Sequence, residues 1–498
     1  MAIIPSHDVA LADDFGRPVP AWWDYWSSQG SSSTSSLINV LEHGAAGNGT
    51  SNDASAINAC MVTASITGGI VFIPGAHTYN LGSSQITIPD GVTVLCGRNA
   101  VLERTADVLP ILPMVSVGNF CKWTGGTLTK GNVSGTSVTS QTIGTGVKTF
   151  ATQAGVAIFA VGQFLRFQSR GATASHMEGT VTAYSGTSIT VDFAFATGSG
   201  AHTDWDISSG SGSNSSMELA GVTQSVIENV RVTGAWYVGL LMSAFNPVSV
   251  TLVTSSCTFR NCWVEGAQNR GIYLYGTCNY NLVENCYVDG QSALGDYGVN
   301  LNPGNPSGTV NTQTGNKVVN TNVVGCGFQG FEIGDLCTYN RISSCYASNI
   351  TAASGVGFLV QTANSNTPTY NRINDCHAIG CSGEGFAFIA ADFGGADDCT
   401  AFFCGIGFYI AASGATQSVS VALNGCEAES STTVGFQVAG NSSRCDLNGI
   451  KAISNGTNGV QIDAGAVRTL VTGRSFGNSG SNLSDAGTVS VTTGLTTA

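Results

Sequence analysis

Residues 372–389 have the sequence RINDCHAIGCSGEGFAFI, and residues 395–411 repeat its pattern as GADDCTAFFCGIGFYIA. Each stretch has a cysteine, an alanine two residues later, a second cysteine after three more residues, and then a Gly-Phe pair. Apolar and polar residues alternate on both sides of the first cysteine, which is the period-two pattern of a half-buried β-strand. The two stretches therefore predict one repeated β-structural unit.

The same unit recurs between about residues 226 and 462, in nine copies 23 to 36 residues apart. The cysteine position is held by Cys262, Cys286, Cys345, Cys376, Cys399 and Cys426, and in the sister copies by Val230, Asn322 and Ile450. Two residues later each copy has Val or Ala, including Val324 in the Asn322 copy, and eight to twelve residues after the cysteine position comes Gly followed by an apolar residue. The lower limit near 23 residues indicates a fixed coil of chain with loops of variable length.

A single copy is too small to bury its own apolar face, whereas stacked copies bury a continuous core. A coil of this length made of strands predicts a right-handed parallel β-helix, an all-β solenoid. A leucine-rich repeat has a similar length, but its leucine consensus and helical half are absent.

The repeated cysteines are expected to point inward and to stack from coil to coil, at the strand spacing of about 4.8 Å. We interpret them as small buried hydrophobic residues rather than as metal ligands or nucleophiles. A chain of 498 residues has core enough without disulfides. The sequence therefore predicts mostly free thiols and folding in a reducing cytoplasm.

Composition narrows the range of partners. Only 10% of the residues are charged, 65 are glycine, and the net charge is −13, which argues against nucleic acid and against an anionic membrane surface as partners. No apolar run of 18 residues predicts membrane insertion. The first residues lack the basic and apolar regions of a signal peptide, so none is expected.

Residues 37–136 are expected to form an N-terminal cap and the first coils. A helix is predicted from about Asp53 to Ser65 with Asp53 as its N-cap, followed by a buried strand over residues 69–74. His43-Gly44-Ala45, Gly47-Asn48-Gly49, Asn52-Asp53 and Ile73-Pro74-Gly75…Tyr79 resemble the capping segment of pectate-lyase-like β-helix proteins. The resemblance implies architecture and carries no catalytic residues.

Three further regions flank or interrupt the coils. Residues 137–208 break the pattern and predict an inserted small antiparallel β-barrel that closes near Trp205; coils are expected again over 209–470, fading after residue 462, and a C-terminal cap or tail over 471–498. Residues 1–36 combine an aromatic cluster with a Ser-rich linker and are expected to dock to a partner through Trp22, Trp23, Tyr25 and Trp26. Packing of this cluster as a cap is the alternative.

The inserted module and the N-terminal segment together resemble bacteriophage tailspikes and tail fibres. The resemblance implies a homotrimer on the virion, assembled in the bacterial cytoplasm, attached through residues 1–36 to a tail or baseplate protein, and binding bacterial surface polysaccharide. It implies no cofactor. No trimerisation domain is evident in the sequence.

Outward positions of the coils form ladders too, and counting from the cysteines locates the candidate site. One residue past the cysteine position, Trp263 and Tyr287 fall on consecutive coils and predict an aromatic platform suited to sugar rings. Three residues past it, Glu265 and Asp289 are expected side by side, as in a retaining glycosidase, with one pKa raised by the other charge. Packing of the aromatics against a neighbouring subunit, and a solvated face for the acids, are the alternatives.

A second candidate group lies on the strand after each glycine. Tyr273, Tyr275, Asn300 and Asn302 are expected to bind glycan there, and Glu332 with Asp335 is the second candidate catalytic pair, with Asp296 in a flanking loop. No residues predict a metal site. The recurring pairs Tyr280-Asn281, Tyr339-Asn340 and Tyr370-Asn371 are interpreted as structural turns.

The sequence thus favours a polysaccharide-binding tailspike-like protein that either cleaves its glycan or only holds it. A non-catalytic tail fibre or adhesin, and a cellular pectate-lyase-like lyase or hydrolase, remain the alternatives.

Overall fold

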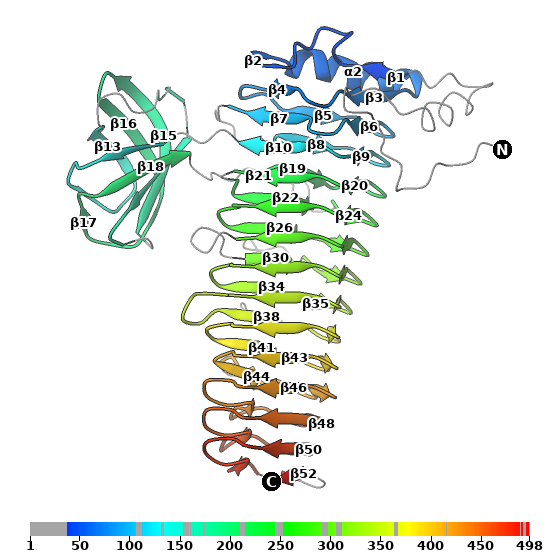
Figure 1. Ribbon diagram of the computed structural model, residues 1–498, viewed down its shortest axis with the longest axis vertical. Coiled ribbons are helices and arrows are strands. Elements are labelled where there is room, and N and C mark those ends of the chain that lie inside the picture. The colour runs from blue at the N-terminus through cyan, green and yellow to red at the C-terminus, as the bar shows by residue number, and fades with distance from the viewer. Residues whose placement is uncertain are drawn as a thin grey trace, which may run out of the picture. The chain divides into compact units, whose positions relative to one another are not determined.

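A computed structural model describes residues 37–105, 112–130, 134–152, 159, 161–162, 164–172, 175–209, 215–234, 236–244, 252–290, 297–304, 311–362, 367–414, 416–488, 490–491 and 495–497 (Figure 1). The chain divides into two compact units. The first comprises residues 1–218, 230–239 and 267–269, and the second comprises residues 219–229, 240–266 and 270–498.

Parallel ladders build the first coils of unit 1. One ladder joins β1 (Leu37–Asn39), β3 (Ile70–Ile73), β6 (Thr93–Cys96) and β9 (Lys122–Thr124). A second joins β2 (Asn48–Asn52), β4 (Thr78–Asn80), β7 (Val101–Arg104), β10 (Thr127–Lys130) and β21 (Arg231–Thr233), and a third pairs β5 (Ile86–Ile88) with β8 (Val115–Val117). Because each strand pairs with the equivalent strand of the next coil, the chain winds as a solenoid.

The predicted helix is present as α2 (Ala54–Thr67), and it buries Ile57, Cys60 and Met61. Asp53 is its N-cap residue, but its side chain makes no capping hydrogen bond. The buried carboxylate instead accepts hydrogen bonds from the backbone N–H of Ala46, at 2.6 Å, and of Gly47, at 3.2 Å. The predicted N-cap residue is therefore confirmed, but its carboxylate oxygens bind the preceding glycine-rich turn instead of the first turn of the helix.

The predicted barrel consists of β11 (Ser134–Ser137), β13 (Gly146–Ala151), β14 (Phe164–Ser169), β15 (His176–Ser185), β16 (Ser188–Thr197) and β18 (Trp205–Ser209). These strands form one antiparallel sheet in the order β11-β18-β14-β15-β16-β13, and a bridge between Ser137 and Thr152 brings its two edges together. The short strands β12 (Gln141–Thr142) and β17 (Ala201–His202) pair separately. Phe150, Phe167, Phe193 and Trp205 fill the interior, so this module has its own core.

Two long ladders run through unit 2. Ladder A joins β20 (Val226–Glu228), β24 (Thr258–Arg260), β28 (Leu282–Glu284), β32 (Lys317–Val319), β36 (Arg341–Ser343), β39 (Arg372–Asn374), β42 (Gly395–Asp397), β45 (Ala422–Asn424), β48 (Asp446–Ile453) and β50 (Leu470–Phe476). Ladder B joins β25 (Trp263–Glu265), β29 (Tyr287–Asp289), β33 (Asn322–Val324), β37 (Tyr346–Ser348), β40 (His377–Ile379), β43 (Thr400–Phe402) and β46 (Glu427–Glu429), and continues through β48 and β50 to β52 (Leu495–Thr497).

Ladder C joins β26 (Arg270–Tyr275), β30 (Tyr297–Asn302), β34 (Gln329–Ile333), β38 (Val356–Gln361), β41 (Glu384–Ile389), β44 (Ile406–Ala411), β47 (Phe436–Val438), β49 (Val460–Ile462) and β51 (Leu483–Asp485). A short fourth ladder joins β23 (Thr254–Ser255), β27 (Cys278–Asn279), β31 (Gln313–Thr314) and β35 (Cys337–Thr338). Two more strands, β19 (Ser215–Ala220) and β22 (Val238–Ser243), contain the boundaries between the units. Figure 1 shows the strands of unit 2 stacked coil upon coil. The coils do not fade after residue 462 as the sequence predicted, because β51 and β52 continue ladders C and B.

The inward columns confirm the predicted core. All sixteen cysteines are buried and free. Five phenylalanines of the Gly-Phe pairs stack face to face at centroid distances of 4.7–4.8 Å: Phe331, Phe358, Phe386, Phe408 and Phe436. The core of unit 2 is therefore built of columns of like residues.

In one copy of the repeat the structure differs from the predicted register by one residue. Asn322 lies in register with Tyr287 and Tyr346, so it points outward, and Val323 rather than Val324 is in register with Val288 and Ala347. The cysteine position of this copy is Thr321, which is fully buried and whose Oγ1 accepts a hydrogen bond from the backbone N–H of Cys286. A shift of one residue turns every side chain to the other face, so it changes which residues the surface presents.

The glycines of the repeat are explained by packing. A Cβ on Gly385 would lie 2.8 Å from the Cβ of Ala401, and a Cβ on Gly407 would lie 2.6 Å from that of Ala428. The glycine column thus rests on the Val/Ala column, which accounts for the presence of both columns in the sequence.

The Asn of each Tyr-Asn turn is structural, as predicted. The side-chain oxygens of Asn316, Asn340 and Asn371 each accept, at 2.9 Å, the backbone N–H of the asparagine one coil earlier. These buried amides form a ladder that fixes the turns before β28, β32, β36 and β39. Among the described residues, no helix is both long and apolar enough to span a membrane.

Candidate functional site

The predicted aromatic platform is present on ladder B. The rings of Trp263 on β25 and Tyr287 on β29 have centroids 4.3 Å apart and planes tilted by 39°. Trp263 is 43% exposed. The repeat places both rings outward because Cys262 and Val264 on either side of Trp263 point into the core. An apolar ring surface on two consecutive coils is therefore open to a ligand.

The first candidate carboxylate pair lies on the same strands, two residues further on. Glu265 and Asp289 are register partners and both are half-buried. Burial, and then the negative charges of Asp289 and Glu265, raise the pKa of the Tyr287 hydroxyl. The two acids, the phenol and the indole thus form one continuous patch on β25 and β29.

The second candidate carboxylate lies in a closed polar cluster on ladder C. Tyr273, Asn300 and Glu332 follow one another in register. The Glu332 carboxyl accepts hydrogen bonds from Nδ2 of Asn300, from Nδ2 of Asn302 at 3.5 Å and from Nε2 of Gln361 at 2.9 Å. Burial raises the pKa of Glu332, and the amide donors and the charge of Arg270 oppose this shift only in part. Three consecutive coils therefore surround one buried carboxyl group whose pKa is raised.

This cluster is less accessible than the sequence suggested. Tyr273, Asn300, Glu332 and Asp335 are buried, although the first three point outward from their strands. Tyr275 and Asn302 are half-buried. The rings of Tyr273 and Tyr275 lie 5.2 Å apart.

Sequence reasoning missed three members of the cluster. The guanidinium of Arg270 lies 4.3 Å from the centroid of Tyr273 and 4.8 Å from that of Tyr297, and Gln361 donates to Glu332. Arg270 directly precedes the glycine of its repeat, and Tyr297 directly precedes the next, so their equivalent positions were a usable signal.

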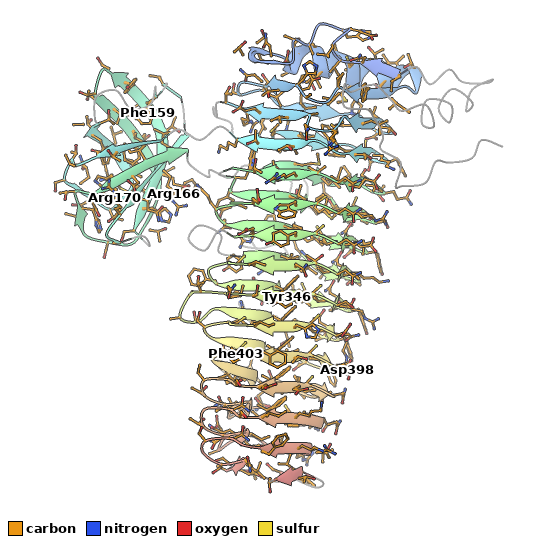
Figure 2. All side chains as sticks on the ribbon, viewed as in Figure 1. Phe159, Arg166, Arg170, Tyr346, Asp398 and Phe403 are labelled. Atoms are coloured by element: carbon orange, nitrogen blue, oxygen red, sulfur yellow. The ribbon has the colours of Figure 1, made fainter. Side chains whose placement is uncertain are left out.

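Other predicted residues are placed elsewhere or not described. Trp22, Trp23, Tyr25, Trp26 and Asp296 lie outside the described residues. Arg166 on barrel strand β14 and Arg170, which follows that strand, are both labelled in Figure 2. They pair with Glu178 at 3.6 Å and with Asp206 at 3.0 Å, so neither is an unpaired cation. Within the described ranges, no group of three or more His, Cys, Asp or Glu side chains is arranged to hold a metal ion.

Comparison with known proteins supports the fold. A family model described as a right-handed β-helix region matches residues 171–305. No curated protein sequence matches the chain.

Solved structures of similar fold include phage proteins. The Dettilon tailspike protein is 13% identical with a TM-score of 0.50, over 91% of this chain and 68% of that one. Tailspike protein 3 of bacteriophage CBA120 is 10% identical with a TM-score of 0.50, over 89% of this chain and 62% of that one. The catalytic unit of an α-1,3-glucanase from Streptomyces thermodiastaticus is 13% identical with a TM-score of 0.49, over 90% and 70% of the two chains. The family model and the two tailspike structures support the right-handed parallel β-helix fold. At identities this low the likeness shows the fold alone and says nothing about activity.

Proposed function

We propose that this right-handed parallel β-helix is a tailspike-like receptor-binding protein that recognises a bacterial surface polysaccharide. The observation that carries the proposal is the Trp263–Tyr287 stack, a partly exposed aromatic surface on consecutive coils with two carboxylates in register beside it. Sugar rings present C–H faces to aromatic side chains and hydroxyls to carboxylates, so this patch offers both kinds of contact. The likeness in fold to two phage tailspikes supports the proposal.

The assembly proposed with this function is a homotrimer attached to a phage tail or baseplate protein through residues 1–36, with Trp22, Trp23, Tyr25 and Trp26 as the docking cluster. Light scattering on the full chain measures the molar mass and therefore the number of subunits. A monomer mass would contradict the trimer.

Retention on immobilised host lipopolysaccharide or capsule tests glycan recognition. Trp263→Ala with Tyr287→Ala should lower the affinity at least about tenfold, because stacked aromatic contacts contribute most of the apolar contact with a sugar. Phe403→Ala is the matched control, since Phe403 is an exposed aromatic ring in a turn of the same unit (Figure 2). Equal binding by the platform variant and the native protein would refute the site.

Glycan cleavage is the second candidate function, and the carboxylate pair on β25 and β29 favours it. Glu265 and Asp289 are register partners on adjacent strands, the close arrangement that a retaining glycosidase needs. If shortened chains form, Glu265→Gln and Asp289→Asn should each abolish them while binding persists; Glu332→Gln and Asp335→Asn test the other pair. Binding with no shortened product would leave a non-catalytic fibre or adhesin. A cellular lyase or hydrolase of pectate-lyase-like type would instead act on plant or free polysaccharides.

A further inference from the structure

Ladder A carries a row of positive charge. Lys317, Arg341 and Arg372 are the first residues of β32, β36 and β39, and they lie in register on three consecutive coils. Strands of neighbouring coils are about 4.8 Å apart. Like charges directly opposite one another destabilise a sheet. The fold itself therefore gains nothing from this arrangement.

The rest of the protein does not neutralise the row. Elsewhere on ladder A, Arg260 is paired with Glu284, its register partner, at 2.8 Å. For Lys317, Arg341 and Arg372 the described residues provide no side-chain hydrogen bond or ion pair, and Nη1 of Arg372 is buried with no acceptor.

Two acidic residues on these and the next coil already have hydrogen-bond partners. Asp375 accepts a hydrogen bond from the Ser344 hydroxyl at 3.1 Å, and Asp397 accepts one from the Asn424 amide at 2.6 Å. A buried N–H donor without an acceptor is costly, so an acceptor from outside the described chain would stabilise this site.

Exposed aromatic rings border the row. Tyr339 and Tyr370, each two residues before an arginine, stack at 5.0 Å, and Phe393 continues the stack at 5.2 Å. Tyr339 is 62% exposed and Tyr370 is 45% exposed.

Tyr339 and Tyr370 have a backbone conformation that is unfavourable for aromatic residues. Tyr339 and Tyr370 have φ of 55° and 58°, a left-handed conformation that bulky residues rarely adopt, and Gly315 fills the same turn position in an earlier coil. The buried asparagine ladder holds the turn whichever residue occupies this position. The turn thus requires the left-handed conformation, which Ser256 and Ser420 adopt in other coils, but it does not require an aromatic side chain at this position.

We propose that Lys317, Arg341 and Arg372, with the Tyr339–Tyr370 edge, bind the anionic groups of an acidic polysaccharide. This rests on the proposed function and specifies its ligand class. Guanidinium groups bind carboxylate or phosphate in a bidentate manner, and a row repeated from coil to coil matches a polymer with regularly spaced charges. Phenol hydroxyls and ring edges beside the row contact the sugar. Single-stranded nucleic acid fits less well, because base stacking needs free ring faces and these faces cover one another.

Retention of the full chain on immobilised polygalacturonate and hyaluronan, with dextran as neutral polymer and single-stranded DNA as competitor, tests the inference at about 50 and about 300 mM salt. The native protein should bind the two acidic polymers more tightly than dextran, and salt should weaken this binding. Lys317→Gln with Arg341→Gln should lower retention about tenfold, because two charge-assisted contacts are lost.

A matched pair controls for net charge. Lys451 and Arg474 are also in-register cations, but Lys451 is paired with Glu427 at 3.2 Å, so Lys451→Gln with Arg474→Gln should change retention by less than about twofold. The first variant should also unfold at the same temperature as the native protein or a higher one, because it removes like-charge contacts. A purely structural role would instead lower the unfolding temperature.

Three results would overturn the inference: no native binding to either acidic polymer, equal loss in both variant pairs, or tighter binding of DNA than of polyuronate. The two proposals can fail separately. If Trp263→Ala with Tyr287→Ala weakens binding to host glycan but Lys317→Gln with Arg341→Gln leaves it unchanged, this inference is refuted and the proposed function stands. Absence of binding to host glycan would refute the proposed function itself.

Discussion

At the scale of single residues, Glu332 shows that an outward position on a strand does not imply exposure to solvent. The sequence places it outward on the strand after a glycine, next to Asn300 and Asn302. The structure adds that Gln361 and Arg270 join it and that the carboxyl is buried. Because a carboxyl in such surroundings is neutralised by protonation more readily than in water, Glu332 links stability to pH.

Glu332→Gln tests this linkage. The pKa of Glu332 is raised in the folded state, so its contribution to stability is complete below the ordinary glutamate pKa and is lost as the pH rises through the folded value. The unfolding free energy of the native protein should therefore fall relative to that of the variant as the pH rises above about 4, the ordinary glutamate pKa. Denaturant titrations at several pH values measure it, and a difference that stays constant with pH would contradict the prediction.

At the scale of elements, the packing of one coil on the next depends on two columns that touch, the glycines of one coil and the Val or Ala residues of the next. Gly385 rests on Ala401 of the next coil, and the same contact recurs between Gly407 and Ala428. The Gly-apolar and Val/Ala signatures are thus two sides of one contact between adjacent coils. A sequence pattern reveals the contact because it repeats.

Gly385→Ala should lower the unfolding free energy by about 1–3 kcal/mol, the usual cost of overpacking a core. The added Cβ would lie 2.8 Å from the Ala401 Cβ and 2.8 Å from the Gly407 carbonyl oxygen. Combination with Ala401→Gly should restore part of the loss, since one of the two close contacts disappears. Chemical denaturation of the three variants shows whether the effects are coupled; simple additivity would mean that the two columns do not touch.

At the scale of the whole molecule, protection of the core depends on every coil being stacked. All sixteen thiols are buried, so a reagent in solvent cannot reach them while the coils stay stacked. Burial also raises the pKa of Cys278 and of Cys445, so the thiolate forms of these two residues are scarce.

The native protein should therefore react with less than about one equivalent of a thiol reagent in minutes, and all sixteen cysteines should react after denaturation. The absorbance of the coloured thiolate that a disulfide reagent releases measures the number of cysteines that have reacted. Fast labelling of several cysteines in the native state would mean that the coils open independently of one another.

The sequence alone determined the parallel β-helix, the inward cysteine column, the capping helix, the barrel strands and the placement of Trp263, Tyr287, Glu265 and Asp289 in register on adjacent strands. Inward positions repeat with period two and tolerate few residue types, so their pattern survives in a single sequence. Only the tertiary structure decided that Asn322 points outward, that the cluster around Glu332 is closed, and that Lys317, Arg341 and Arg372 form an unneutralised row. These features depend on register across loops of unequal length and on packing over outward faces, and no local pattern encodes either.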